Sequence, residues 1–260
     1  MKAQTYSEWI EFSFQYLNEN RLDSAEIALK NALKTDPANA LNPFLFNNLG
    51  TIQRRQGKAS EALESYTLAL KRYPKNTTFL SARASLFSEI GSFNNALIDY
   101  SILLDEDPNN EEALYQRGLL YTNLKEFDSA KKDFNQILEL NPLSFFARIG
   151  LASLLKIEGN WSEAEKIYNY LEEQKPELPD IYAGRAELFL LMEKGGKALA
   201  DINKAIRLSG EQTNNPYLYI IRSKAKILLY EKQSAIDDIH KALSLGYDKT
   251  AAENLLELIK

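Results

Sequence analysis

The sequence predicts an all-α fold, a solenoid of stacked antiparallel helical hairpins, from three observations. An alanine recurs at intervals of 37, 34, 34, 34, 34 and 37 residues, at Ala25, Ala62, Ala96, Ala130, Ala164, Ala198 and Ala235. Each interval holds two blocks whose apolar residues are three, four and seven positions apart, the spacing of one helix face. All eight prolines lie near the junctions between successive repeat units, which leaves the stretches between them free to be helical. A fixed period of this length is typical of a solenoid.

The alanines divide the chain into seven units, expected to form one array that spans residues 1–260 as a single domain. Two three-residue insertions, 40–42 and 213–215, account for the longer intervals. Residues 250–260 carry Ala252, Leu255, Leu256 and Ile259 on one side and are expected to form a final helix that covers the last unit. The expected units are approximately 6–39, 43–76, 77–110, 111–144, 145–178, 179–212 and 216–249.

Within a unit, the first helix is expected to approach the second closely. A small residue stands twelve positions before each alanine, and a bulky residue there would push the helices apart. The polar linker between the helices, for example residues 123–128, is short enough to make them antiparallel. Gly195 and Gly196 are expected to form a bend in this linker. The small residues are Ser13, Gly50, Ala84, Gly118, Ala152, Ala186 and Ser223.

The second helix is expected to end at a proline in most units. Asp36-Pro37, Tyr73-Pro74, Asp107-Pro108, Asn141-Pro142 and Lys175-Pro176 occupy this place, and proline disfavours helical geometry in the residue before it. The sixth and seventh units carry Gly210 and Tyr247 there instead.

The pattern Leu49-Gly50, Ala62, Tyr66, Ala69 and Pro74 resembles the tetratricopeptide repeat, and the resemblance recurs over essentially the whole chain. It implies a right-handed superhelix whose first helices line a concave groove, used to bind peptides and assemble complexes. The aromatic residues at the repeated packing places are expected in the core: Tyr66, Tyr100, Phe134 and Tyr168.

Four units share an arginine in the first helix and an aspartate sixteen residues later, while the other three lack both. Because an arginine between helices needs a carboxylate to satisfy it, we expect structural ion pairs within or between hairpins. An anion-binding ladder is the alternative. The expected pairs are Arg83 with Asp99, Arg117 with Asp133, Arg185 with Asp201, and Arg222 with Asp238.

The candidate concave face follows from helix geometry, since residues three before, one after and four after the small residue share a side. This face is polar in the middle of the chain and more apolar at both ends. A lysine-and-asparagine clamp for a terminal carboxylate, known in some members of the family, is absent, because the matching places hold Asn47, Thr51, Ile10 and Phe14. The predicted partner-binding residues are Asn47, Thr51, Arg54, Ser81, Ser85, Tyr115, Thr122, Ser153 and Lys156.

The composition offers little for catalysis. There is no cysteine and only one histidine, His240, so that a nucleophilic triad and a zinc site lack residues. No phosphate-binding glycine loop occurs. The net charge of −5 disfavours a nucleic acid partner. The sequence therefore predicts neither enzyme activity nor cofactor nor metal.

The leading hypothesis is a scaffold that binds an extended peptide or a partner helix in the groove. The alternative is a structural subunit that uses its apolar terminal repeats to join a larger or self-associated assembly. No apolar run approaches the roughly 20 residues that span a bilayer, which indicates no membrane insertion.

Lys2-Ala3-Gln4 resembles the start of a mature secreted bacterial chain. An extracytoplasmic, periplasmic location is therefore expected, with the cytoplasm as the alternative.

Overall fold

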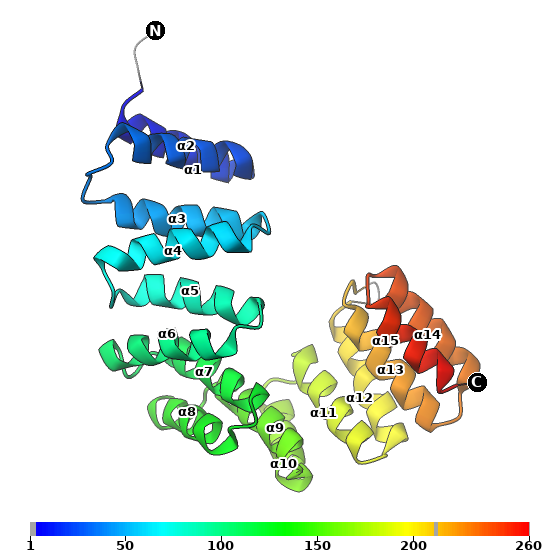
Figure 1. The fold of residues 1–260 in the computed structure, drawn as a ribbon. Coiled ribbons are helices and arrows are strands. Elements are labelled where there is room, and N and C mark those ends of the chain that lie inside the picture. Colours follow the sequence, from blue (N-terminus) through cyan, green and yellow to red (C-terminus); the bar gives the residue numbers. More distant parts are fainter. Residues whose placement is uncertain (1–3, 211–212, 260) are drawn as a thin grey trace. The chain divides into compact units, whose positions relative to one another are not determined.

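The computed structural model describes residues 4–210 and 213–259, and within these residues the chain forms fifteen α-helices and no β-strand. Lys2 and Ala3, on which the expected location rests, lie outside them. The helices follow one another as antiparallel pairs (Figure 1). They are α1 (Tyr6–Asn18), α2 (Leu22–Thr35), α3 (Asn42–Arg55), α4 (Ala59–Arg72), α5 (Thr77–Glu89), α6 (Phe93–Glu106), α7 (Glu111–Asn123), α8 (Phe127–Leu140), α9 (Phe145–Glu158), α10 (Trp161–Gln174), α11 (Pro179–Leu191), α12 (Gly195–Leu208), α13 (Pro216–Leu228), α14 (Lys232–Ser244) and α15 (Lys249–Glu257).

The helices belong to two compact units, Met1–Leu140 and Asn141–Lys260. The first unit stacks four hairpins in chain order, from α1 and α2 to α7 and α8 (Figure 1). The second unit stacks three hairpins, from α9 and α10 to α13 and α14, and α15 packs on α14. Each unit is thus a short solenoid in which a hairpin contacts its neighbours in sequence.

The predicted close approach within each hairpin is confirmed. All seven repeat alanines are 0% exposed, and the small residue twelve positions earlier is buried in every hairpin. Gly118 shows how tight the fit is, because a Cβ there would lie 2.7 Å from Cε1 of Phe134. Phe134 itself is fully buried, as are Tyr66, Tyr100 and Tyr168, so the expected core aromatics are also confirmed.

The turn inside each hairpin depends on one residue in the left-handed region of backbone geometry. Glycine, which adopts this region freely, holds the place three times, at Gly57, Gly91 and Gly159. Asn20, Lys125, Glu193 and Tyr230 hold the same place in the other four hairpins. All seven stand five residues before a repeat alanine.

The expected bend at Gly195 and Gly196 is wrong. These two residues are the first of α12, and the left-handed residue of that turn is Glu193. Gly195 is small for a packing reason, since a Cβ there would lie 3.0 Å from Cβ of Leu228.

The ends of the second helices follow two rules. Five of them end two residues before a proline, close to the place that the sequence predicts. In α12 and α14, which lack that proline, Gly210 and Gly246 take positive φ angles of 86° and 91° shortly after the last helical residue. A left-handed glycine is a common helix end because it tolerates this geometry.

The four arginines lie beside the four aspartates. Each guanidinium donates from Nε and Nη2 to both carboxylate oxygens, for example Arg117 to Asp133 at 2.8 and 2.7 Å. The arginine is on the first helix of a hairpin and the aspartate on the second. The other three pairs, with the same two contacts, are Arg83 with Asp99, Arg185 with Asp201, and Arg222 with Asp238.

The third nitrogen, Nη1, joins each arginine to the preceding hairpin. In Arg117 it donates to Ser101 on α6 at 3.4 Å, and in Arg185 to Asn169 on α10 at 2.7 Å. The hydrogen bond to Asp133 raises the pKa of Arg117. One side chain therefore ties three helices of two successive hairpins together.

Glu26 on α2 links the first two hairpins, where no such arginine exists. Its carboxylate accepts from Lys30 and Lys58 at 2.7 Å each and from Gln53 at 3.3 Å. The residue is only 6% exposed. Burial alone raises the pKa of Glu26, but the three hydrogen bonds outweigh it and lower the pKa from 4.5 to about 2.

We expect acid to weaken the N-terminal hairpins through Glu26. Because its pKa is lower in the folded chain, the stabilisation is complete above pH 4.5 and is lost as the pH falls to about 2. A shift of this size corresponds to about 3 kcal/mol at neutral pH. Urea denaturation across this range should show a shallower loss of stability in Glu26→Gln than in the wild type. Glu61→Gln on exposed α4 surface is the matched control, and a slope unchanged in Glu26→Gln contradicts the assignment.

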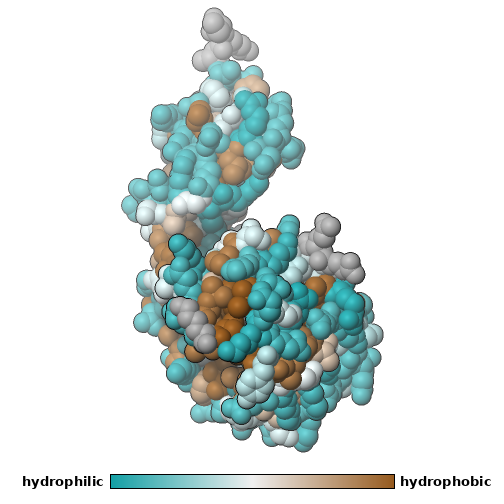
Figure 2. Space-filling view, turned by 90° about the vertical axis from the view of Figure 1, so that its right-hand side faces the viewer, coloured by the Kyte–Doolittle hydropathy of each residue, from teal (hydrophilic) through white to brown (hydrophobic). Residues whose placement is uncertain are grey.

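The two chain ends differ in how they cover apolar residues. Ile10 and Leu17 pack in the core of the first hairpin, whereas Phe14 is 53% exposed. At the other end, Ala252 and Ile259 are buried against Ile239 of α14. The side with α14 and α15 also shows hydrophobic surface among hydrophilic groups (Figure 2).

In the part of the chain that the structure describes, no helix combines the length and the apolar character needed to cross a bilayer.

Candidate functional site

A polar groove crosses the first-helix side of the N-terminal unit, over α5. Its volume is about 450 Å³. Three of the nine predicted partner-binding residues, Arg54, Ser81 and Ser85, line it. Its full lining is Arg54, Thr77, Thr78, Ser81, Ala82, Ser85, Leu103, Asn110 and Glu112.

Two asparagine caps set the register of this groove. Asn76 accepts from the backbone of Phe79 and starts α5, which places Thr77 and Thr78 in its first turn. Ser81 and Ser85, one helical turn apart, follow on the same side. Asn110 caps α7 in the same way and is itself part of the lining. The groove thus combines hydroxyl and amide groups with the small apolar surfaces of Ala82 and Leu103.

Several hydroxyls of the predicted face are engaged within their own hairpin. Ser85 lies 3.2 Å from the hydroxyl of Tyr100, and Thr51 lies 3.2 Å from that of Tyr66. Burial raises the pKa of Tyr100. Because a buried phenol needs a partner, the serine or threonine supports the core as well as lining the surface.

A signal for these hydroxyl pairs was present in the sequence. Ser153 stands in the same relation to Tyr168, fifteen residues on, and burial raises the pKa of this tyrosine too. The fourth hairpin has Leu119 and Phe134 at the two places, so the hydroxyls are absent together. Comparison of positions fifteen apart, rather than sixteen, would have found the pairs.

The two predicted cations of the face are both paired with a carboxylate on a later hairpin. Arg54 on α3 binds Glu89 on α5, with Nε donating to Oε2 at 2.8 Å, and this hydrogen bond raises the pKa of Arg54. Lys156 on α9 binds Glu187 on α11 at 2.5 Å. In the groove, Glu112 accepts from Gln116 at 2.7 Å, and no described cation pairs with it. The groove therefore keeps one uncompensated negative charge.

The remaining predicted residues differ in access. Asn47 is half-buried, and its Oδ1 is buried with no hydrogen-bond partner among the described residues. The ring of Tyr115 packs 6.1 Å from that of Phe134. Thr122 is a correction, since it is only 5% exposed and donates to the carbonyl of Gly118 at 2.8 Å. Its hydroxyl is hydrogen-bonded within α7 and does not face a partner.

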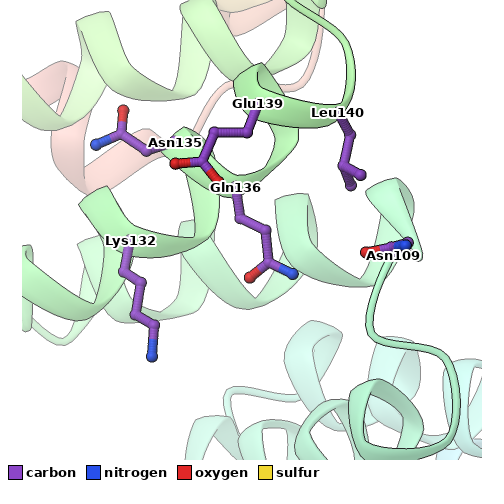
Figure 3. A pocket seen from close by; sticks show the side chains of 6 residues that line it. All are labelled: Asn109, Lys132, Asn135, Gln136, Glu139 and Leu140. Atoms are coloured by element: carbon purple, nitrogen blue, oxygen red, sulfur yellow. The ribbon is translucent and has the colours of Figure 1, made fainter.

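A second hollow of about 520 Å³ lies beside α8, on the second helix of its hairpin. Figure 3 shows side chains of α8 around it, with Asn109 from the loop between α6 and α7 opposite them. Gln136 donates to the carbonyl of Pro108 at 2.8 Å. Lys132, Asn135 and Glu139 are exposed, so solvated side chains frame this hollow and the groove over α5 is the better-defined site.

A metal ion requires several ligating side chains close together. Within residues 4–210 and 213–259, no group of three or more histidine, aspartate or glutamate side chains is arranged to hold one. His240 is exposed on α14.

The sequence matches the model of the tetratricopeptide repeat at residues 16–77, 47–111 and 111–142. It is also similar to a tetratricopeptide repeat protein from Parabacteroides merdae of known crystal structure. The two share 47% identity over 99% of each chain, with a TM-score of 0.92. No curated protein matches.

More distant structures share the fold alone. PilW, a widely conserved type IV pilus biogenesis factor, is 18% identical with a TM-score of 0.68 over 85% of this chain and 99% of its own. YrrB, described as a TPR protein with an unusual peptide-binding site, is 20% identical with a TM-score of 0.53 over 79% of this chain and 98% of its own.

Proposed function

This chain belongs to the tetratricopeptide repeat family, whose repeats generally serve as non-enzymatic scaffolds for protein–protein interaction, and we propose that it binds an extended peptide in the groove over α5. The observation that carries the proposal is the lining of that groove, where hydroxyl and amide groups surround Ala82 and Leu103. Such groups can hydrogen-bond a peptide backbone, and the small side chains leave room for it.

The charges of the groove favour a peptide with a basic residue. Arg54 is already neutralised by Glu89, whereas Glu112 faces no described cation. A lysine or arginine of the peptide would supply the missing charge. The proposed partner is therefore a protein segment that is extended, polar and basic.

We expect Ser81→Trp to weaken peptide binding at least tenfold. Ser81 makes no side-chain hydrogen bond within the described residues, so that the indole fills the groove without breaking an internal contact. Basic peptides selected on the wild-type chain, measured by fluorescence anisotropy, give the affinity. Ser60→Trp, on exposed α4 surface, is the control and should bind as the wild type does. Equal affinity in Ser81→Trp discards the groove over α5 as the site.

One observation supports the alternative of a structural subunit in an assembly. Phe14 on α1 and Ile27 on α2 are large apolar side chains more than half exposed at the N-terminal hairpin. A surface of this kind can join copies of the chain or another subunit. A mass that falls on dilution favours assembly, and a monomer that captures peptides favours the groove.

A further inference from the structure

A small pocket lies at the open end of the first hairpin of the second unit, where α9 begins and α10 ends. Its volume is about 140 Å³. Two cations and two aromatic rings share it with apolar walls. The lining is Leu143, Phe145, Arg148, Tyr170, Leu171, Gln174 and Lys175.

Arg148 is only partly satisfied in this pocket. Its Nη2 donates to the carbonyl of Pro142 at 2.8 Å, and its guanidinium carbon lies 4.5 Å from the ring centroid of Tyr170. Its Nε is buried and has no hydrogen-bond partner among the described residues. A buried donor without a partner is unfavourable, so an acceptor is favoured there.

The positive charge of the pocket is also uncompensated. Lys175 lies 5.6 Å from the ring centroid of Phe145. Within the described part of the chain, neither Lys175 nor Arg148 forms an ion pair with a carboxylate. Arg185 on α11, by contrast, is held by both Asp201 and Glu172. The pocket thus presents an unused N–H donor and two cations beside Leu143 and Leu171.

We propose that this pocket binds a carboxylate carried by a short aliphatic group. A carboxylate accepts from an arginine in a charge-assisted hydrogen bond, and the aliphatic group contacts the leucines and rings. The volume suits such a group, because a cavity of about 150 Å³ holds a benzene molecule. The C-terminus of a peptide that ends in leucine and a free short-chain fatty acid share this chemistry. The site is independent of the groove over α5.

Three small probes test the proposal on the full-length chain. N-acetyl-leucine represents a peptide C-terminus, 4-methylpentanoate a fatty acid, and N-acetyl-leucinamide the neutral analogue. We expect at least one carboxylate to bind ten times more tightly than the amide in NMR titrations, with shifts at Leu143, Leu171 and Tyr170. The tighter of the two acids identifies the source. Equal binding of the amide, or of acetate alone, overturns the proposal.

A matched pair of variants locates the effect. Arg148→Met keeps most of the aliphatic stem and should weaken binding of the acid at least tenfold. Arg207→Met removes the same charge from exposed α12 surface and should leave binding unchanged. Unchanged binding in Arg148→Met overturns the assignment. The acid and amide comparison on the wild type decides the proposal even where Arg148→Met fails to fold.

Discussion

Asp133→Ala is expected to lower the free energy of unfolding by about 3 kcal/mol. The carboxylate is 1% exposed and accepts two hydrogen bonds from Arg117. Its removal leaves the guanidinium between two helices without the charge that compensates its loss of water. The magnitude is set by this uncompensated cation, more than by the lost attraction.

A double-mutant cycle measured by urea denaturation checks this prediction. Arg117→Ala should cost a similar amount, and the double variant should cost little more than either single variant. Glu106→Ala is the control, because its partner Lys75 is exposed and such pairs contribute about 0–1 kcal/mol. Additive losses at Asp133 and Arg117 contradict a structural pair.

Gly118→Leu is expected to destabilise the chain by about 3 kcal/mol. Even its Cβ would lie 2.7 Å from the buried ring of Phe134, so that the ring or the helix has to move. The better helix propensity of leucine, about 1 kcal/mol over glycine, offsets only part of this cost.

Two further variants, compared by thermal or urea denaturation, isolate the steric cause. Gly196→Leu adds the same side chain to α12 at a place where a Cβ meets nothing within 4 Å, and it should be between neutral and stabilising by about 1 kcal/mol. Phe134→Ala should cost less in the Gly118→Leu background than alone, because it frees the space. A wild-type stability of Gly118→Leu contradicts the close packing inferred for this hairpin.

The fold could be predicted because the repeat allows the same position to be compared across seven hairpins of one chain. At a packing position such as that of Ala62, every hairpin imposes the same steric limit, and the limit is visible as one residue type at a fixed period. The Arg117 and Asp133 pair could be inferred for a related reason, since neither partner is tolerated without the other. A constraint from burial or from charge pairing is visible in the sequence when it recurs at the same position of several hairpins.

The binding face was harder to predict because helix geometry gives direction but not access. Thr122 was assigned to the face by its position, yet its hydroxyl is turned to the carbonyl of Gly118. Arg54 is on the face, but it forms an ion pair with Glu89 of the next hairpin, which neutralises its charge. The turn between α11 and α12 could not be predicted for another reason. Glu193 adopts a positive φ there, although glutamate does not favour this geometry. The direction of a hydroxyl, the partner of a cation and the φ angle of a turn depend on side-chain rotamers and on neighbouring residues that differ from one repeat to the next.

The hydroxyl contact between Ser85 and Tyr100 couples the surface of the groove to the core of its hairpin. A substitution of Ser85 that removes its hydroxyl also leaves the buried phenol of Tyr100 without this partner. In the fourth hairpin the same two places hold Leu119 and Phe134, neither of which has a hydroxyl. A change of Leu119 therefore breaks no internal hydrogen bond, whereas a change of Thr51, Ser85 or Ser153 removes the partner of a buried tyrosine in the second, third or fifth hairpin.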